Sequence, residues 1–170
     1  MQSPRNRHLA TVAITLIAAL HEPGPTIAGQ NSNDWPQLLG PSRNGTVMTE
    51  ITPWPTGGPR IRWRKTVGEG FAGPSVVGKT LILFHRVDNL EVVEALDVAT
   101  GKAFWSAAYP TTYRDDFGFD EGPRATPTIT DGQVFTCGAQ GILQALDLTK
   151  GSQLWSVDTH AEFRVRKGFF

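Results

Sequence analysis

Residues 95–105 read ALDVATGKAFW, and residues 145–155 read ALDLTKGSQLW. Alanine, aspartate, glycine and tryptophan take the same places in both stretches, 50 positions apart. The similarity extends upstream, where residues 73–79 (GPSVVGK) match residues 126–132 (TPTITDG) with one residue inserted in the second copy. Trp63 precedes Trp105 by 42 positions. Self-similarity at a nearly fixed period indicates a repeat architecture, in which each unit packs against its neighbour.

Within each repeat, four short apolar runs separated by turn residues predict four β-strands. The first repeat gives strands over about 72–77, 80–86, 91–97 and 103–108, and the second over about 125–130, 133–138, 142–147 and 153–158. Asp131-Gly132 suits a two-residue hairpin, because a type I′ turn needs positive φ at both positions. No helical apolar stripe is visible beyond the first thirty residues. Four antiparallel strands in each repeat of about 40–50 residues are typical of propeller blades.

The first repeat resembles the tryptophan-docking motif of the pyrroloquinoline quinone (PQQ)-type β-propeller family at every defined position: Ala95, Asp97, Thr100, Gly101, Lys102 and Trp105. The second repeat keeps Ala145, Asp147, Gly151 and Trp155, but it has Lys150 and Ser152 where the motif has Thr and Lys. Residues 34–45 and 122–127 are also similar to exported bacterial members. The resemblance implies an all-β, partial β-propeller of about two four-stranded antiparallel blades plus an extra strand, after an N-terminal signal helix.

The motif predicts contacts between blades. In the family, the indole stacks on the glycine peptide and on the alanine of the next repeat. Burying a tryptophan side chain of about 150–250 Å² contributes about 4–6 kcal/mol. Asp97 is expected to accept backbone N–H groups in its turn, and Gly101 is expected to supply a positive φ. These residues are therefore interpreted as structural rather than ligand-binding.

The first residues predict export. Arg5 and Arg7 precede the uncharged run at residues 9–20 (LATVAITLIAAL), and small residues surround a possible cleavage point after Ala28. Twelve helical residues rise about 18 Å, too short for a bilayer core of about 30 Å, so we expect no membrane span after signal cleavage. The predicted organisation is a signal peptide at 1–28, an extended segment at 29–60 and incomplete repeats at 61–170. We expect a periplasmic or extracellular location in a bacterium.

Charge and cysteine content exclude several kinds of site. The formal net charge is zero, with 16 Lys plus Arg against 16 Asp plus Glu, so no overall field favours nucleic acid. Cys137 is the single cysteine. It can form neither an internal disulfide nor a multi-cysteine metal site, and it has no adjacent base to activate it. His85 and His160 have no partner at metal-ligand spacing, so we predict no metal-binding residues.

A long connection between the two repeats is the candidate ligand-face loop. Residues 109–124 (YPTTYRDDFGFDEGPR) fill a link that takes four residues, 68–71, before the first repeat. Function concentrates in such loops. The candidate residues are charged: Arg114, Asp115, Asp116, Asp120, Glu121 and Arg124. The acidic residues offer the oxygens that Ca²⁺ prefers, but their spacing does not fit an EF-hand and solvated acidic turns are commoner.

Three functions are compatible with these features. The leading hypothesis is an exported repeat protein, expected to be an N-terminal portion of a longer propeller or a truncated product, that acts as a binding scaffold for an unidentified protein or small molecule. The first alternative is the N-terminal part of a PQQ-dependent alcohol dehydrogenase, which would need PQQ and Ca²⁺. The second is a propeller like the outer-membrane protein assembly factor, which usually carries a lipid-bearing cysteine that this chain lacks after its apolar run. No catalytic residue is predicted, and enzymatic activity of this chain alone is not expected.

Overall fold

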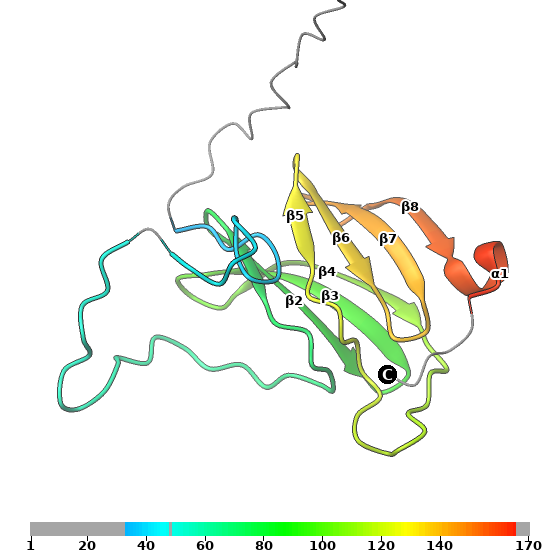
Figure 1. The fold of residues 1–170 in the computed structure, drawn as a ribbon, viewed down its shortest axis with the longest axis horizontal. Helices are drawn as coiled ribbons and strands as arrows, with labels where there is room; N and C mark the ends of the chain where they lie inside the picture. Colours follow the sequence, from blue (N-terminus) through cyan, green and yellow to red (C-terminus); the bar gives the residue numbers. More distant parts are fainter. Residues whose placement is uncertain (1–32, 48, 166–170) are drawn as a thin grey trace, which may run out of the picture.

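The computed structural model describes residues 33–47 and 49–165 and shows two four-stranded antiparallel sheets (Figure 1). In each sheet the strands follow chain order, β1-β2-β3-β4 and β5-β6-β7-β8. The first sheet holds β1 (Ser75–Val77), β2 (Thr80–Val87), β3 (Leu90–Asp97) and β4 (Ala103–Pro110). The second holds β5 (Thr128–Thr130), β6 (Gln133–Cys137), β7 (Ile142–Asp147) and β8 (Gln153–Asp158). The predicted all-β fold with two four-stranded propeller blades is confirmed.

Strand pairing repeats as the sequence does. Ala95 lies opposite Trp105 in the first sheet, and Ala145 lies opposite Trp155 in the second. Both pairings shift register directly after the alanine. The predicted hairpin at Asp131-Gly132 has φ angles of 50° and 72°, as the type I′ turn requires.

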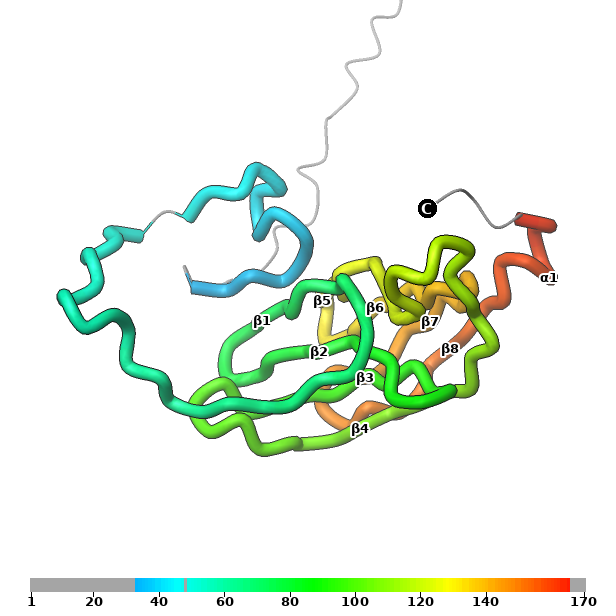
Figure 2. The backbone as a smooth tube through the Cα atoms, turned by 90° about the horizontal axis from the view of Figure 1, so that it is seen from below, coloured from blue at the N-terminus to red at the C-terminus, as the bar shows by residue number. Residues whose placement is uncertain are grey.

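The core lies between the two sheets, which Figure 2 shows packed one behind the other. Its buried side chains come from both repeats: Ile82, Phe84, Val93 and Ala95 from the first sheet, and Ile129, Val134 and Leu146 from the second. Burying an aliphatic or aromatic side chain of this kind contributes about 1.5–3 kcal/mol. Neither sheet can bury this face alone, so each repeat depends on the other.

The segment before the repeats reaches the inner edges of both sheets. Trp35 pairs with Val76 of β1 through two backbone hydrogen bonds, of 2.8 and 2.9 Å. The carbonyl of Pro36 accepts the N–H of Ile129 in β5, at 2.8 Å. This segment therefore occupies backbone groups that an edge strand would otherwise leave open. The described residues from 49 onward then extend away from the sheets (Figure 1), and Trp63 brings the chain back to the first sheet through its hydrogen bond with Val98.

A short helix follows β8. The helix α1 (Thr159–Phe163) begins where the carboxylate of Asp158 accepts the backbone N–H groups of His160 and Ala161, at 2.9 and 3.1 Å. The prediction of no helix after the signal segment is wrong here. Five residues are too few to show a helical period, and the N-cap residue is the only local signal. Within the described ranges, no helix has the length and apolarity to cross a bilayer. The predicted signal peptide, 1–28, lies outside the described residues.

Candidate functional site

Two tryptophans, Trp63 and Trp105, contact the turn of the repeat that follows them. Trp105 Nε1 donates to the carbonyl of Leu148 at 2.9 Å. Its ring lies against Gly151, where a β-carbon would come within 2.5 Å of Trp105 Cδ2. Trp63 makes the same contacts one repeat earlier: its Nε1 donates to the carbonyl of Val98 at 2.9 Å, and its ring lies against Gly101. Only glycine leaves room for the indole at these two turns.

Each motif aspartate organises its own turn. Asp97 Oδ1 accepts the hydroxyl of Thr100 at 2.7 Å and the backbone N–H of Thr100 at 2.8 Å. The hydroxyl hydrogen bond, helped by the backbone N–H groups, lowers the pKa of Asp97 below its ordinary value. Asp147 accepts the backbone N–H groups of Thr149 and Lys150, at 2.9 and 2.7 Å. Lys150 offers no hydroxyl, so the second turn lacks one hydrogen bond of the first.

The remaining motif residues divide between interior and surface. Ala95 and Ala145 are completely buried beside their paired tryptophans. Lys102 is exposed and directly precedes β4. Trp155 is 41% exposed, and its ring contacts Phe135 with 6.0 Å between ring centroids. The described chain provides no third turn for this indole.

The connection at 109–124 is held in place by Arg86, a residue that the sequence analysis missed. The Arg86 side chain is 3% exposed. Its Nη1 donates to the carbonyls of Tyr113 and Glu121, at 2.8 and 3.1 Å, and its Nε donates to the carbonyl of Asp88 at 2.6 Å. The only sequence signal was a charged residue within the apolar run of β2. Arg86 thus joins the first sheet to the candidate ligand-face loop.

The charged residues of this loop are engaged with one another and with the backbone. Asp115 accepts the N–H groups of Phe117 and Phe119 and pairs with Arg124 at 2.9 Å. Asp120 accepts the N–H groups of Gly122 and Gly70, at 2.8 and 3.1 Å. Glu121 pairs with Arg114 at 2.9 Å. These pairs hold the loop in one conformation, although Arg114 and Asp116 stay exposed.

The acidic residues do not fit a Ca²⁺ site. Among the described residues there is no group of three or more His, Cys, Asp or Glu side chains that could hold a metal ion. Calcium requires about six to eight oxygen ligands. Asp115 and Asp120 direct their oxygens to N–H groups and to an arginine, as described above.

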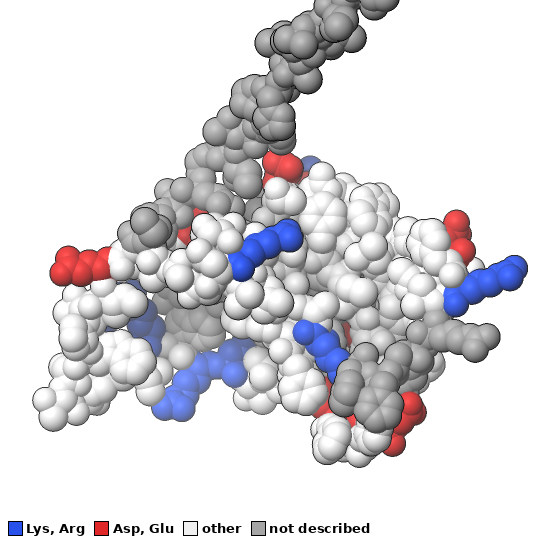
Figure 3. All heavy atoms as spheres, viewed as in Figure 1, with Lys and Arg blue, Asp and Glu red and all other residues white. Residues whose placement is uncertain are grey.

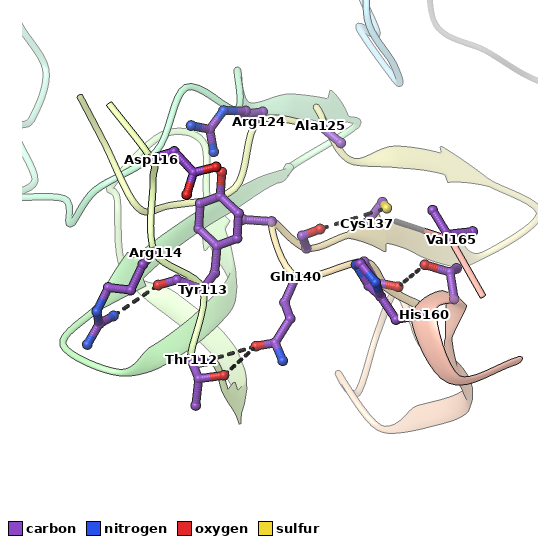
Figure 4. Close-up of a pocket in the computed structure, with 14 residues that line it drawn as sticks. Thr112, Tyr113, Arg114, Asp116, Arg124, Ala125, Cys137, Gln140, His160 and Val165 are labelled. Carbon is purple, nitrogen blue, oxygen red and sulfur yellow. Dashed lines mark hydrogen bonds between the residues drawn. The ribbon is translucent and has the colours of Figure 1, made fainter. Parts of the chain in front are cut away.

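A pocket of about 600 Å³ opens between the loop, the β6–β7 turn and α1 (Figure 4). The loop contributes Thr112, Tyr113, Arg114, Asp116 and Arg124, and the turn contributes residues 138–141. The wall is completed by Ala125, Cys137, Thr159, His160 and Val165. Gln140 ties two of these walls together, because its Oε1 accepts the backbone N–H of Thr112 at 2.8 Å. A smaller cavity of about 420 Å³ lies between the β2–β3 turn and the loop, and Arg114 lines both.

The buried carboxylate of Glu91 stabilises the β6–β7 turn, which lines the larger pocket. Glu91 is completely buried; its Oε2 accepts the hydroxyl of Tyr109 at 2.5 Å, and its Oε1 accepts the N–H of Ala139 at 2.7 Å. Burial, and then the charge of Glu91, raise the pKa of Tyr109 far above its ordinary value, so the phenol remains a donor. Gly138 packs directly against Glu91 and Tyr109, where any β-carbon would collide. The β6–β7 turn is therefore fixed by contacts with the first sheet.

Cys137 and the two histidines among the described residues, His85 and His160, lie at two different places in the structure. Burial, together with the nearby Glu91, raises the pKa of the Cys137 thiol and keeps it protonated. His85 is buried, and its Nδ1 accepts the backbone N–H of Gly68 at 2.8 Å. The ring N–H is therefore on Nε2, which donates to Oε2 of Glu94 at 3.1 Å. His160 lines the pocket. The structure thus brings Cys137 and His160 to one cavity and places His85 elsewhere.

Charges are dispersed on the face shown in Figure 3, where acidic and basic side chains are scattered without a large area of one sign. This agrees with the formal net charge of zero. A dominant field of the kind that concentrates polyanions is absent from that face of the described chain.

Comparisons with known proteins place these features in a family. The model of the family described as outer membrane protein assembly factor BamB matches residues 55–167. No curated protein matches the chain. The chain is similar to solved structures of a quinohemoprotein alcohol dehydrogenase from Comamonas testosteroni (26% identity, 58% of this chain and 14% of that chain, TM-score 0.41) and of BamB from Moraxella catarrhalis (22% identity, 56% of this chain and 26% of that chain, TM-score 0.41).

It is also similar to a europium-containing methanol dehydrogenase (24% identity, 58% of this chain and 18% of that chain, TM-score 0.44). The chain thus spans between 14% and 26% of the length of these structures. The family model covers well over half of the sequence, including both motif repeats and the loop between them. The chain therefore belongs to the PQQ-like β-propeller repeat family whose model is described as outer membrane protein assembly factor BamB.

Proposed function

We propose that this chain is an exported repeat protein that acts as a binding scaffold, with the pocket beside the 109–124 loop as its binding site. The observation that carries the proposal is that three separate segments converge on one cavity of about 600 Å³. Ligand sites are typically concave and mostly apolar with a few polar groups. Here Arg114, Asp116 and His160 supply polar groups beside apolar walls.

The pocket is supported by contacts formed without a ligand. Arg86 donates hydrogen bonds to the loop, and Gln140 joins the loop to the β6–β7 turn. The buried carboxylate of Glu91 accepts a backbone N–H of that turn. A site that is already ordered loses less conformational entropy on binding. This supports binding rather than a purely structural role for the long connection.

The proposal does not include catalysis. Cys137 is held as a thiol, and thiolate is the nucleophilic form. A role as the opening part of a PQQ-dependent alcohol dehydrogenase has no specific support from the loop, because its carboxylates do not fit Ca²⁺. We therefore derive no step through PQQ or Ca²⁺.

The cell envelope is the proposed location. Its support is the charged and apolar pattern at residues 5–28 together with the description of the matched family, which refers to assembly of outer membrane proteins. Fractionation of the native host tests this part. The chain is expected in the envelope or medium and shortened by about 28 residues; full-length chain in the cytoplasm would contradict it.

Ligand binding is tested by amide NMR of the purified chain during a screen of small-molecule fragments and short peptides. Ala139→Trp fills the pocket while retaining the backbone N–H that Glu91 accepts. Ala99→Trp places the same side chain on an exposed turn at the opposite end of the first sheet. Ligands are expected to shift the signals of Gln140 and His160 in the wild type and in Ala99→Trp, but not in Ala139→Trp. An absence of ligands, or ligands indifferent to Ala139→Trp, would refute the proposed site.

A further inference from the structure

Three exposed phenylalanines gather at the 109–124 loop, which projects beyond the ends of the strands (Figure 1). Phe119 is 76% exposed, Phe71 is 63% exposed and Phe117 is 48% exposed. The rings of Phe117 and Phe119 are stacked, with 6.0 Å between their centroids and 20° between their planes. Apolar side chains that cluster on a surface mark interaction sites, whereas single exposed ones need no explanation. We call these three side chains the phenylalanine surface.

One ion pair connects the three phenylalanines. The side chain of Asp115, which is 7% exposed, accepts the backbone N–H groups of Phe117 and Phe119. Asp115 also pairs with Arg124 at 2.9 Å. The Arg124 guanidinium in turn lies over the Phe71 ring, 5.8 Å from its centroid. The backbone that carries the rings is therefore held by hydrogen bonds, although the rings themselves are exposed.

The link before the first repeat, which carries Phe71, packs tightly against the loop. The Phe71 N–H donates to the carbonyl of Pro123 at 2.9 Å. A β-carbon on Gly122 would collide with the carbonyl oxygen of Glu69, so only glycine allows this approach. A surface that is ordered before it binds loses less conformational entropy when a partner arrives.

The phenylalanine surface lies outside the two cavities beside the loop. None of its three side chains lines either cavity. Arg124 separates Phe71 from the larger cavity, because its guanidinium also lies over the ring of Tyr113, which lines that cavity. Small molecules bind in concave sites that enclose most of their surface, whereas exposed aromatic side chains are enriched where another protein binds. The phenylalanine surface therefore suits a macromolecular partner.

The charge around the phenylalanine surface selects among macromolecules. Residues 113–124 carry four acidic side chains and two arginines. The neighbouring Glu69 adds a fifth acidic side chain and the buried Arg86 adds a third positive charge, which leaves an excess of two negative charges. Nucleic acids and anionic lipid surfaces attract Lys and Arg, so this excess disfavours both. The basic side chains of a polypeptide are favoured instead.

We propose that the phenylalanine surface binds a polypeptide segment in which apolar side chains stand next to lysine or arginine. The apolar side chains of the partner lie against the exposed rings, and its basic side chains face the acidic residues around them. The inference goes beyond the proposed function, because it concerns a second surface that does not need the pocket.

Selection from a phage-displayed library of random short peptides tests the proposal. The purified wild-type chain and a Phe117→Ser/Phe119→Ser variant serve as parallel targets. Peptides enriched on the wild type alone are expected to be rich in apolar side chains and in Lys and Arg. In fluorescence anisotropy, Phe71→Ser should weaken the binding of these peptides by at least about tenfold, as truncation of a central interface residue does.

Three further variants separate this surface from the rest of the chain. Phe104→Ser is the matched control, because Phe104 is 55% exposed near the start of β4, whereas the loop follows the end of that strand. It should leave peptide affinity unchanged, and so should Ala139→Trp, which fills the pocket. Glu69→Gln should weaken binding at low salt and have a smaller effect at high salt, because salt screens exposed charges.

Several results would overturn the proposal. The first two are that no peptide distinguishes the two targets, or that the selected peptides are acidic. The third is peptide affinity that Phe71→Ser leaves unchanged, with near-ultraviolet circular dichroism showing that the variant folds.

Two other occupants would also be recognised. Binding of the wild type, but not of Phe117→Ser/Phe119→Ser, to phosphatidylcholine vesicles without any peptide binding would assign the surface to a membrane. Self-association in sedimentation velocity that the same double variant abolishes, again without peptide binding, would assign it to a second copy of the chain. Either result would refute a polypeptide partner of this chemistry. Neither bears on the pocket, since fragment binding to Ala139→Trp tests that site separately.

Discussion

Trp105 Nε1 lies 2.9 Å from the carbonyl oxygen of Leu148, a residue 43 positions later in the chain and in the turn that follows β7 of the other sheet. The indole ring also covers Gly151, whose φ is +69°. One side chain therefore joins the outer strand of the first sheet to a turn of the second. The same relationship between Trp63 and Val98 makes it a property of the repeat.

The two equivalent tryptophans are expected to differ in their contribution to stability. Trp105→Ala should lower the free energy of unfolding by about 3 kcal/mol or more, because it removes buried contacts and leaves a cavity. Trp155→Ala should cost much less in dilute protein, because Trp155 is 41% exposed. Urea unfolding followed by circular dichroism measures both. Equal losses of unfolding free energy would contradict the prediction, because they would show that the contact of Trp105 with the second sheet adds nothing to stability.

Arg86 is expected to control the order of the ligand-face loop. Arg86→Ala removes the donors to the carbonyls of Tyr113 and Glu121 and leaves these groups partly buried. Hydrogen exchange at residues 113–121 should become at least about tenfold faster, and the free energy of unfolding should fall by about 3 kcal/mol. Arg62→Ala, at an exposed arginine, is the control. An unchanged hydrogen-exchange rate in Arg86→Ala would mean that the loop is ordered without the Arg86 side chain.

The Glu91–Tyr109 pair predicts a loss of stability at high pH. The pKa of Tyr109 in the folded chain lies above its ordinary value of 10.0, so the folded state keeps its phenol proton when the unfolded state loses it. Stability from this group is complete below about pH 10 and falls as the pH rises above it toward the folded pKa. Tyr109→Phe should remove this part of the pH dependence and cost about 1–3 kcal/mol at neutral pH, since Glu91 loses a donor.

Urea unfolding between pH 7 and pH 11 measures the effect. The chain has two tyrosines, so Tyr113→Phe controls for the loss of a phenol as such. A wild type and a Tyr109→Phe variant with parallel pH profiles would contradict the assignment.

Calcium and PQQ are expected to leave the purified chain unchanged. The carboxylates of Asp115 and Asp120 already accept backbone N–H groups, and Asp115 also pairs with Arg124, so binding Ca²⁺ would break these contacts. Adding Ca²⁺ should not raise the unfolding temperature, and adding PQQ with Ca²⁺ should yield neither quinone absorbance on the protein nor dye-linked alcohol oxidation. A calcium-dependent rise in the unfolding temperature would revive the dehydrogenase alternative.

The sheets could be predicted from the sequence because they are built from local signals. Turn residues such as Asp131-Gly132 and the recurrence of Trp105 at Trp155 mark strand ends and period directly. The predicted strands agree with the observed ones to within about three residues. The helix α1 escaped prediction, because its only signal is the single cap residue Asp158.

The site was predicted less completely. The 109–124 loop was identified by its length and charge, but its charged residues turn toward one another, and the pocket depends on residues far away in the sequence. Arg86 and Glu91 are charged residues within largely apolar strands, and Gln140 lies in an ordinary turn. Their roles come from tertiary contacts that no spacing in the sequence reveals.

The central claim is that the indole of one repeat and the glycine turn of the next form one energetic unit. A double-mutant cycle of Trp105→Ala and Gly151→Ala measures this directly, with urea unfolding of the wild type, both single variants and the double variant. In the wild-type background, Gly151→Ala places a methyl group against the ring; in Trp105→Ala that ring is gone. We predict a coupling free energy of about 1 kcal/mol or more, and strict additivity within about 0.3–0.5 kcal/mol would contradict the account.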